Sequence, residues 1–546
     1  MKVLIGIGQL NATVGDLSGN REKIVSAIRR AKREGAELVV FPELVLLGYP
    51  PRDLLHRRGF LEAAEREFSQ VVAAAQGVGV VLGHVVVGGR GEARVDPSAA
   101  AFGGDMVLYN AAFLLADGGV VGYQAKHRLP SFDVFEEERY FTPGEQVKVL
   151  EWRGLRLGLS VCEDLWREGG VLAAQAAAGV DLLINVSASP YFRGKPALRH
   201  ELGKRWAALA GAPLVYVNLT GGQDELVFDG GSFAVRPDGA FLLSAPSFEE
   251  GVYVVDLAGP PVPPPQGDGI AHIFRALTTG IRDYVEKNGL KGALIGISGG
   301  VDSAVTAALA CQALGRERVL GAFLPGPYTS PESREGAQAL AAALGIRLLE
   351  IPIEGAYQAL AEAISPHAAV AGLVAENLQA RIRGLLLMTL SNATGHVVLC
   401  PGNKSEVAMG YNTLYGDTVG ALAPIGDLLK TEVYQLATYI NQRAKRELIP
   451  KGILSRPPSA ELRENQRDDQ DLPPYRELDP LLSALIVENA SWSELASRFG
   501  QELTQKALLR LASSEYKRRQ LPLVIKVSPK AFGMGRRWPI TCKYWR

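Results

Sequence analysis

The sequence is poor in metal-binding and disulfide-forming residues. It has four cysteines among 546 residues, and none of them lies in a C-x-x-C pair. Its seven histidines are scattered along the chain. This excludes a disulfide-stabilised scaffold and argues against a structural zinc site. Lys+Arg and Asp+Glu balance at 58 each, so no overall field exists to hold nucleic acid.

Long hydrophobic runs are also missing. No segment approaches the roughly 18 apolar residues of a membrane helix. The opening "MKVLIGIGQLNATVGD" contains an apolar run too short for a signal peptide, and no small-residue cleavage site follows it. We therefore expect a soluble cytoplasmic protein with no membrane partner.

A proline- and glycine-rich segment divides the chain nearly in half. Neither a helix nor a central strand tolerates "AGPPVPPPQGDG", residues 258–269. A long surface loop is the alternative, but the pattern changes across the segment. We predict a first domain over residues 1–257, a linker over 258–269 and a second domain over 270–546.

The first half combines buried strands with amphipathic helices. Strands are predicted from runs rich in Val, Leu and Ile over residues 2–10, 36–44, 78–87, 155–162, 181–189, 213–219 and 251–257. Residues 20–35 and 196–211 are predicted to be helices, and residues 113–123 a hairpin around Asp117-Gly118-Gly119. This mixture suggests a layered α/β/β/α sandwich.

The second half alternates strand and helix more regularly. Strands are predicted over residues 293–297, 318–324 and 346–353, and helices over 303–315 and 332–345. Such alternation is typical of an open parallel sheet flanked by helices.

Cys162 ends the strand of residues 155–162, and two acidic residues, Glu163 and Asp164, follow it directly. One interpretation is a buried core thiol, since free cysteine packs as a small hydrophobe. A nucleophilic cysteine would need a base or a positive neighbour. Glu43 and Lys126 also stand at strand ends, and strand ends in a sheet can converge on one pocket. Taken singly, each is a weak signal, because a Glu before a loop or a Lys after a strand is usually only solvated.

Three motifs in this half resemble the nitrilase superfamily of carbon–nitrogen hydrolases. They are "FPEL", "KHRLPSFDVFEEERYFTPG" and "SVCEDLW", in this order. The resemblance implies a nitrilase-like sandwich with Glu43 as general base, Lys126 as stabiliser of the thiolate and the oxyanion, and Cys162 as nucleophile. Glu163 would then be a second carboxylate near the lysine.

Two further segments, "NVSASPYFRGK" and "GGQDELVFDGGS", resemble the glutaminase branch of that superfamily. The resemblance implies that Ser189 and Lys195 hold the α-amino acid end of glutamine, with Phe132 beside them. Phe132 stands where the branch commonly has tyrosine, so a hydroxyl contact is lost there.

A strand, a glycine-containing loop and a helix make up "ALIGISGGVDSAVTAALA". Glycines let the backbone approach phosphate oxygens, and the helix N-terminus adds unpaired N–H groups. Ser298 and Ser303 offer hydroxyls, and Asp302 can hold magnesium. A plain strand-to-helix turn is the alternative. Both G-x-x-x-x-G-K-[ST] and G-x-G-x-x-G are absent, which argues against γ-phosphate transfer of the Walker type.

The complete S-G-G-x-D-S loop resembles that of the N-type ATP pyrophosphatases, enzymes with an adenine nucleotide α-hydrolase type of parallel sheet. The segments "PGNKSEVAMGYNTLYGDTVGALAPIGDLLKTEVYQLA", "ELRENQRDDQDLPPY" and "YKRRQLP" resemble NAD synthetases. Together the two halves resemble the glutamine-dependent NAD synthetases over nearly the whole chain.

The resemblance implies a site for each substrate of the second half. ATP would be bound by Gly296, Ile297, Ser298, Gly299, Gly300, Val301, Asp302, Ser303 and Pro401. Deamido-NAD would be bound by Asn377, Glu406, Tyr411, Asn412, Thr413, Leu414 and Lys517. Magnesium would be held by Asp302 and Glu406. For Asp417 and Lys430 a structural salt bridge or a solvated charge is nearly as good an explanation.

Two departures from the family pattern concern this half. Pro401 replaces a usual threonine, which removes a side-chain contact to ATP. Leu523-Val524-Ile525 stands where a Pro-Gly is expected.

We therefore predict that the protein uses glutamine, ATP and deamido-NAD as small-molecule substrates, with magnesium as cofactor, and forms a homo-oligomer. Glutamine would be hydrolysed at Cys162, and its ammonia would amidate an adenylated nicotinate carboxylate to give NAD, glutamate, AMP and pyrophosphate. One alternative is an amidotransferase acting on another adenylated acid. Another is a nucleotide-sensing regulator with an inactive loop.

Overall fold

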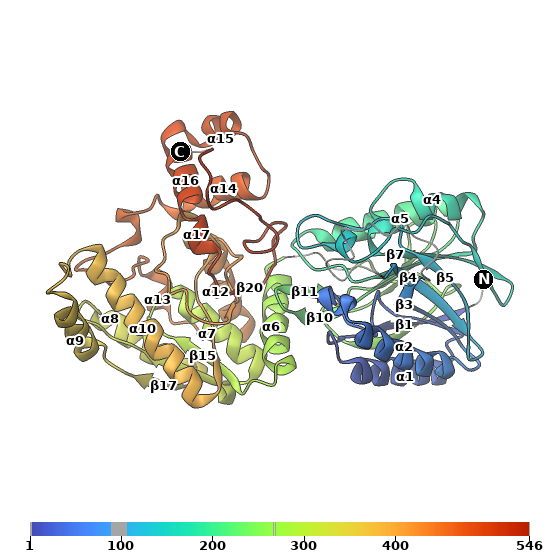
Figure 1. Ribbon diagram of the computed structural model, residues 1–546, viewed down its shortest axis with the longest axis horizontal. Helices are drawn as coiled ribbons and strands as arrows, with labels where there is room; N and C mark the ends of the chain where they lie inside the picture. The colour runs from blue at the N-terminus through green and yellow to red at the C-terminus, as the bar shows by residue number, and fades with distance from the viewer. Residues whose placement is uncertain (1–2, 89–105, 266, 268, 545–546) are drawn as a thin grey trace. The chain divides into compact units, whose positions relative to one another are not determined.

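The computed structural model describes residues 3–88, 106–265, 267 and 269–544. Contacts between residues divide the chain into two compact units, drawn in Figure 1. One unit comprises Met1–Gln223 and Val227–Asp268, and the other comprises Asp224–Leu226 and Gly269–Arg546. In the proline-rich segment, the described residues 258–265 and 267 contain no helix or strand.

Two six-stranded sheets form the first unit. One has the order β14-β1-β2-β3-β4-β5 and is built from β1 (Leu4–Gln9), β2 (Leu38–Val40), β3 (Gly79–Val87), β4 (Leu108–Ala116), β5 (Gly119–Ala125) and β14 (Gly251–Asp256). The other has the order β13-β12-β9-β8-β7-β6 and is built from β6 (Leu150–Trp152), β7 (Leu155–Val161), β8 (Leu182–Ser187), β9 (Leu214–Asn218), β12 (Phe233–Val235) and β13 (Phe241–Ser244). A small hairpin pairs β10 (Thr220–Gln223) with β11 (Leu226–Asp229).

The two large sheets pack face to face over a shared apolar core. Ile7 and Val40 from one sheet meet Leu159 and Ile184 from the other, and all four side chains are fully buried. Because side chains alternate along a strand, neighbours such as Leu183 point outward to the helices.

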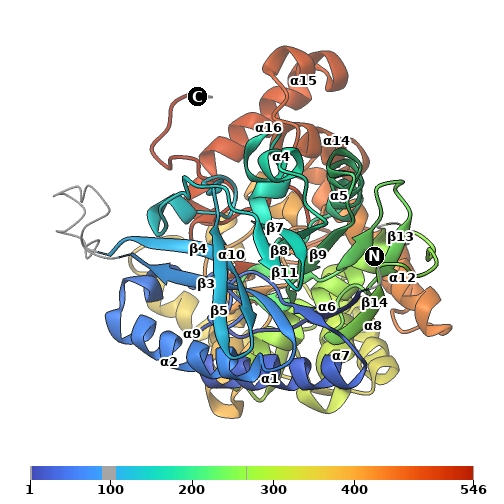
Figure 2. The same ribbon diagram turned by 90° about the vertical axis from the view of Figure 1, so that its right-hand side faces the viewer.

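Helices cover both outer faces of this pair of sheets. The first sheet carries α1 (Leu17–Arg33) and α2 (Arg58–Ala74), and the second carries α4 (Gly170–Ala177) and α5 (Lys195–Ala210). Figure 2 shows the two helix pairs on opposite sides of the sheets. The predicted α/β/β/α sandwich is confirmed.

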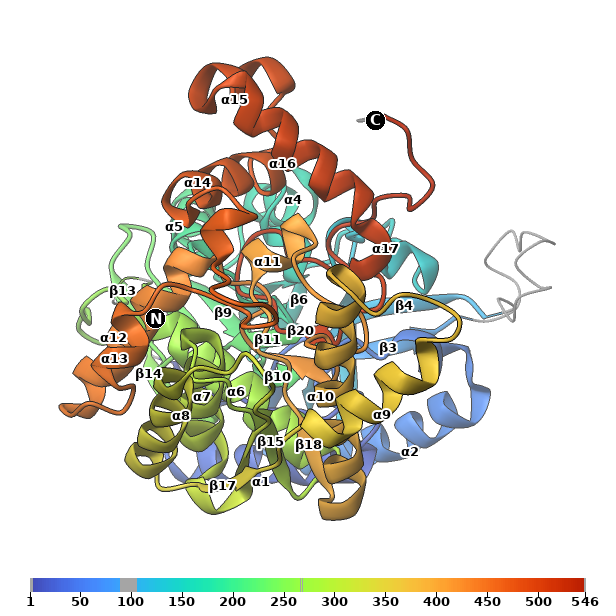
Figure 3. The same cartoon turned by 90° about the vertical axis from the view of Figure 1, so that its left-hand side faces the viewer.

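A four-stranded parallel sheet organises the second unit. Its order is β17-β16-β15-β18, from β15 (Gly292–Gly296), β16 (Val319–Phe323), β17 (Arg347–Glu350) and β18 (His396–Val398). One face packs on α7 (Val301–Leu314) and α8 (Pro331–Leu344), and the other packs on α10 (Leu373–Thr394), with α9 (Glu354–Ile364) beside it. Figure 3 shows α7 and α8 on one side of β15 and α9 and α10 on the other. The predicted open parallel sheet is confirmed.

The remaining elements of this unit build a helical layer beside the sheet. They are α6 (Ile270–Lys287), α11 (Lys404–Met409), β19 (Leu422–Ala423), α12 (Lys430–Ala444), α13 (Lys451–Ser455), α14 (Tyr475–Ile486), α15 (Trp492–Phe499), α16 (Gln501–Ser513), α17 (Glu515–Arg518) and β20 (Leu523–Val524). Leu523 and Val524, two of the three residues that stand where the family pattern has Pro-Gly, pair in parallel with β19. In the part of the chain that is described, every helix is too short or too polar to cross a bilayer.

Candidate functional site

The first candidate site lies where three strands of the sandwich end. Glu43 stands three residues beyond β2, and Lys126 follows β5 directly. Cys162 follows β7 and opens the short 3-10 helix η3 (Cys162–Leu165). All three residues are at most 4% exposed. The fold therefore buries side chains that are far apart in sequence in the same part of the sandwich.

Lys126 is the centre of a buried network of charges. Its Nζ lies 2.7 Å from Oε1 of Glu43 and 2.8 Å from Oε1 of Glu137. Glu43 also accepts hydrogen bonds from the side-chain amide of Asn110 at 2.6 Å and from the backbone N–H of Ala188 at 2.8 Å. These bonds fix one carboxylate rigidly against the lysine.

Sequence reasoning missed Glu137 and gave the part of second carboxylate to Glu163. Glu137 lies in the short helix η2 (Glu137–Arg139) and also accepts a hydrogen bond from the hydroxyl of Tyr49 at 2.7 Å. Glu163 pairs directly with Arg167, whose Nε lies 3.1 Å away, and is close enough to Lys126 for the lysine charge to oppose the rise in its pKa that burial causes. The sequence signal for Glu137 was its place inside the motif "KHRLPSFDVFEEERYFTPG", because the acidic run "FEEER" by itself looks like a solvated surface.

Burial controls the protonation of this site. Burial disfavours the charge of Lys126, but Glu137 and Glu43 outweigh it and raise the lysine pKa well above its ordinary value. Burial, opposed mainly by Lys126, raises the pKa of Glu137 to about 7. Burial and the negative charge of Glu43 raise the pKa of the Cys162 thiol far above its ordinary range. The cysteine therefore rests as a thiol, and its deprotonation requires a base.

The backbone at Cys162 is held in an unusual conformation. Its φ is 40°, in the left-handed region that residues with a Cβ rarely adopt. Asp164 holds the turn in place by accepting hydrogen bonds from the backbone N–H groups of Arg128 at 2.9 Å, His127 at 3.2 Å and Val161 at 3.3 Å. Burial raises the pKa of Asp164 to about 6. The turn that carries the thiol is thus tied to the segment that follows Lys126.

The residues expected to bind glutamine differ in their environments. Ser189 is 1% exposed, and its hydroxyl has no hydrogen-bond partner among the described residues. The Lys195 ammonium donates to the carbonyl of Pro190 at 2.9 Å and lies over the rings of Phe192, Trp166 and Phe135, 5.2 to 5.9 Å from their centroids.

Phe132 is 49% exposed and contacts Phe135, with the ring centroids 5.7 Å apart. It lines a cleft together with Glu163 and Arg167, so the structure places it at the rim.

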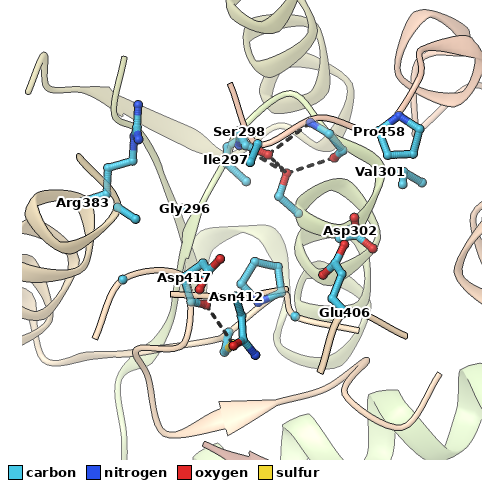
Figure 4. Close-up of a pocket in the computed structure, with 18 of the residues that line it drawn as sticks. Gly296, Ile297, Ser298, Val301, Asp302, Arg383, Glu406, Asn412, Asp417 and Pro458 are labelled. Carbon is cyan, nitrogen blue, oxygen red and sulfur yellow. Dashed lines mark hydrogen bonds between the residues drawn. The ribbon is translucent and has the colours of Figure 1, made fainter. Parts of the chain in front are cut away.

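The second candidate site surrounds the loop between β15 and α7. Residues 296–303 line a pocket whose other walls include Pro401, Glu406, Tyr411 and Asn412, as Figure 4 shows in part. Within the loop, the Ser298 hydroxyl accepts from the N–H of Gly300 at 3.2 Å and lies 3.1 Å from the Ser303 hydroxyl. These bonds curl the backbone around the start of α7.

Glycine is required at one position of this loop. Gly299 has φ +81°, and a Cβ there would collide with the backbone carbonyl of Ser333 on α8. The loop can therefore lie against α8 only without a side chain at this position.

An ion cluster forms one wall of the pocket. Lys430, the first residue of α12, pairs through Nζ with Asp302 and, at 3.0 Å, with Glu406. Asn403 donates to the other Asp302 oxygen at 3.0 Å. Burial raises the pKa of Glu406 to about 8, while Asp302 and Glu406 raise the pKa of Lys430 above its ordinary value despite burial. Lys430 is therefore salt-bridged rather than solvated, and its two partners are the predicted metal ligands.

Asp302 and Glu406 fit a magnesium ion that also binds substrate. Among the described residues, no group of three or more His, Cys, Asp or Glu could hold a metal by itself. Magnesium typically takes only one or two protein carboxylates and completes its shell with phosphates and waters. Two carboxylates on the wall of the pocket lined by residues 296–303 match that requirement.

The predicted deamido-NAD residues fall into two groups. Tyr411 and Asn412 line the pocket, and both polar side-chain atoms of Asn412 are buried and unpartnered among the described residues. Asn377 accepts a hydrogen bond from the Thr413 hydroxyl at 2.7 Å, beside rather than on the pocket wall.

Lys517 and Leu414 also lie outside the pocket lining. The Lys517 ammonium donates to the carbonyls of Gly410 and Asn412 at 2.8 and 2.6 Å, and Arg381 donates to the carbonyl of Leu414 at 3.3 Å. Asp417, whose role the sequence also left undecided, lines the pocket. It accepts a hydrogen bond from the N–H of Thr413 at 2.8 Å, and burial raises its pKa to about 6.

Two further pocket residues were not singled out from the sequence, although Asp468 lies within the quoted segment "ELRENQRDDQDLPPY". Burial lowers the pKa of Arg383, on α10, to about 10, and its Nε donates to the carbonyl of Leu324 at 2.9 Å. Asp468 adds a third carboxylate near Lys430 and accepts from the hydroxyl of Tyr475 at 2.9 Å.

Comparisons with known families agree with this division into two sites. Residues 4–259 match the carbon-nitrogen hydrolase family, and residues 273–521 match the NAD synthase family. A glutamine-dependent NAD(+) synthetase of Thermotoga maritima is 39% identical, with 100% of this chain and 99% of that protein aligned. One from Synechocystis is also 39% identical, over 98% of each chain.

Solved structures give the same result. A glutamine-dependent NAD+ synthetase from Acinetobacter baumannii, in complex with adenosine diphosphate, is 34% identical, with a TM-score of 0.77 over 99% of this chain and 98% of that one. One from Cytophaga hutchinsonii shares the fold, with a TM-score of 0.83 at 20% identity and the same coverage.

Proposed function

Because the chain belongs to the glutamine-dependent NAD(+) synthetase family, we propose that it converts deamido-NAD to NAD with ammonia taken from glutamine, at the expense of ATP. The products are NAD, glutamate, AMP and pyrophosphate. The observation that carries the proposal is Lys126 held between two buried carboxylates, Glu43 and Glu137, in a chain whose second unit builds the loop pocket.

Glutamine hydrolysis begins with proton transfer from Cys162 to Glu43. A carboxylate can act as the base because the thiol must lose its proton only as sulfur bonds to the amide carbon. An ammonium has three donors, and Lys126 uses two on Glu43 and Glu137, which leaves one for the developing oxyanion. Collapse of the tetrahedral species returns the proton to the leaving nitrogen and releases ammonia. Water, deprotonated by Glu43, then cleaves the γ-glutamyl thioester to glutamate.

Ser189, Lys195 and Phe132 are proposed to hold glutamine. The unpartnered hydroxyl of Ser189 is available to a substrate polar atom, and Lys195 brings a positive charge for the α-carboxylate. Phe132 contributes an apolar surface at the rim.

Amidation is proposed to occur at the second pocket. The backbone and hydroxyls of residues 296–303 bind the ATP phosphates, and Lys430 offsets their negative charge. The nicotinate carboxylate attacks the α-phosphorus and expels pyrophosphate, and ammonia then displaces AMP from the acyl adenylate. Magnesium, held by Asp302 and Glu406, supplies charge neutralisation when bound.

The same proposal includes the predicted contacts of deamido-NAD and the domain boundaries. Deamido-NAD would contact Asn377, Glu406, residues 411–414 and Lys517. The domains would be residues 1–257 and 270–546, joined by a linker over 258–269. A homo-oligomer and a cytoplasmic location are also part of it, and sedimentation of the purified chain tests the former.

Substituting Cys162 by alanine tests the two-site proposal. A thiol-to-methyl change disturbs packing little, but no glutamyl thioester can form. Glutamine should therefore support essentially no NAD formation, whereas high ammonium at mildly alkaline pH should restore synthesis. Mass spectrometry of the products measures NAD formation from glutamine and from ammonium. In the wild-type reaction, amide-¹⁵N glutamine reports the source of the nitrogen. Wild-type glutamine-dependent turnover in Cys162→Ala would refute the proposal.

A further inference from the structure

Glu406 and Lys430 sit near the starts of two different helices. Glu406 lies in the first turn of α11, whose N-cap is the Asn403 side chain, and Lys430 is the first residue of α12. The residue before α12, Leu429, cannot cap the helix with its side chain, so the first turn of α12 needs hydrogen-bond acceptors from elsewhere.

Asp479, on α14, accepts hydrogen bonds from residues in the first turns of both helices. The side chain is buried, with the residue 2% exposed. One oxygen accepts from the Ser405 hydroxyl at 2.6 Å, and the other accepts from the N–H and the hydroxyl of Thr431, each at 2.8 Å. The Ser405 hydroxyl in turn accepts from the backbone N–H of Lys430 at 3.0 Å.

The residues that contact Asp479 are the sequence neighbours of the ion pair. Ser405 precedes Glu406, and Thr431 follows Lys430. A carboxylate at the start of a helix is also favoured by the partial positive charge of the unpaired N–H groups there. The two helix starts are therefore joined by a single buried anion.

We propose that Asp479 is a positioning residue of the synthetase site, which ties the first turns of α11 and α12 together and so sets the separation of Glu406 and Lys430. This inference rests on the proposed function of that ion pair in ATP binding. Asp479 lines no part of the pocket and acts through its neighbours.

Asp479→Asn and Ser405→Ala break the same connection from its two sides. The asparagine keeps the size of the side chain but replaces one acceptor with a donor. Substituting a residue that orients a binding side chain commonly costs 10- to 100-fold in affinity, so we expect ATP to bind about tenfold more weakly to either variant in calorimetry without deamido-NAD. The double variant should bind ATP about as weakly as either single variant, because both substitutions break the same hydrogen-bonded connection.

Asn441→Ala provides the matched control. Asn441 lies near the other end of α12 and makes three hydrogen bonds, to Ile449 twice and to Leu448, at 2.8 to 2.9 Å. This variant should lower the melting temperature to a similar extent and leave ATP affinity at the wild-type value.

Ammonia-dependent NAD synthesis, measured on the same preparations, should show a raised KM for ATP in Asp479→Asn but not in Asn441→Ala. Wild-type ATP affinity in folded Asp479→Asn or Ser405→Ala would overturn the inference, as would equal weakening in Asn441→Ala. A wild-type protein that binds ATP but makes no NAD from either ammonia or glutamine would instead refute the proposed function.

Discussion

At the scale of single residues, we expect Glu137 to determine how the proposed hydrolytic site responds to pH. It shares Lys126 with Glu43, and burial raises its pKa to about 7. Ionised Glu137 gives Lys126 a second anionic partner, which keeps the ammonium charged for the developing oxyanion. We therefore expect glutamine hydrolysis by the wild-type protein to rise with pH through about 7.

Glu137→Gln should remove this pH dependence. The amide keeps the size of the side chain but carries no charge, so Lys126 loses one of its two anionic partners. Glutamine hydrolysis should fall by about 100-fold, the usual cost of removing one electrostatic contribution from such a site. Measurement of turnover from pH 5.5 to 9 checks both effects. An unchanged rate with an unchanged profile would exclude Glu137 from the mechanism.

The same substitution should change stability in a pH-dependent way. Burial raises the folded-state pKa of Glu137 above its value in the unfolded chain, so the stability it contributes is present at low pH and is lost as pH rises through about 7. Glutamine at this position does not titrate. The melting temperature of Glu137→Gln relative to wild type should therefore increase between pH 5 and pH 8, as differential scanning fluorimetry would measure.

At the scale of elements, the loop from β15 to α7 depends on glycine. Gly299→Ala would combine a left-handed backbone with a collision against the Ser333 carbonyl. Ammonia-dependent synthesis should drop sharply because the loop must move away from α8, whereas glutamine hydrolysis in the other unit should persist. Gly289→Ala is the matched control: its φ is +64°, but nothing lies within 4 Å of the added Cβ. A similar loss of synthesis in both variants would mean that backbone strain alone matters.

Sequence patterns predicted the elements that carry strong periodicity. The apolar run around Leu159 became a buried strand, and the hairpin around Asp117 formed as expected between β4 and β5. The convergence of Glu43 and Lys126 was also predictable, because both stand at strand ends. Long-range pairing was not: nothing in the run "GVYVVDL" indicated that β14 lies antiparallel to β1.

Residues whose role depends on distant partners could not be identified from sequence. Glu137 sits in an acidic run that resembles a solvated turn, and Asp479 is one acid in a helix. Lys430 at a helix start is equally compatible with solvent and with a buried pair. In each case the decisive contact joins segments separated by many residues, from 11 between Lys126 and Glu137 to 128 between Lys430 and Asp302.

At the scale of the whole molecule, each compact unit has its own apolar core. Units with separate cores often unfold separately, so calorimetry should resolve two transitions. ATP with magnesium, at 100 times its dissociation constant, should stabilise one unit by about 2.7 kcal/mol and so raise the temperature of its transition. An electrophilic glutamine analogue that alkylates Cys162 should raise the other. The Cys162→Ala variant should lose only the second shift, and a single transition raised by either ligand would contradict independent unfolding.

The raised pKa of Cys162 has a consequence for the lifetime of the protein under oxidising conditions. Peroxides and general alkylating agents attack thiolates, and a buried thiol that keeps its proton presents almost none. In the proposed mechanism the nucleophile would form only while a substrate carbonyl is in place to receive it. The same burial that makes the cysteine depend on a base thus preserves it in reduced form between turnovers.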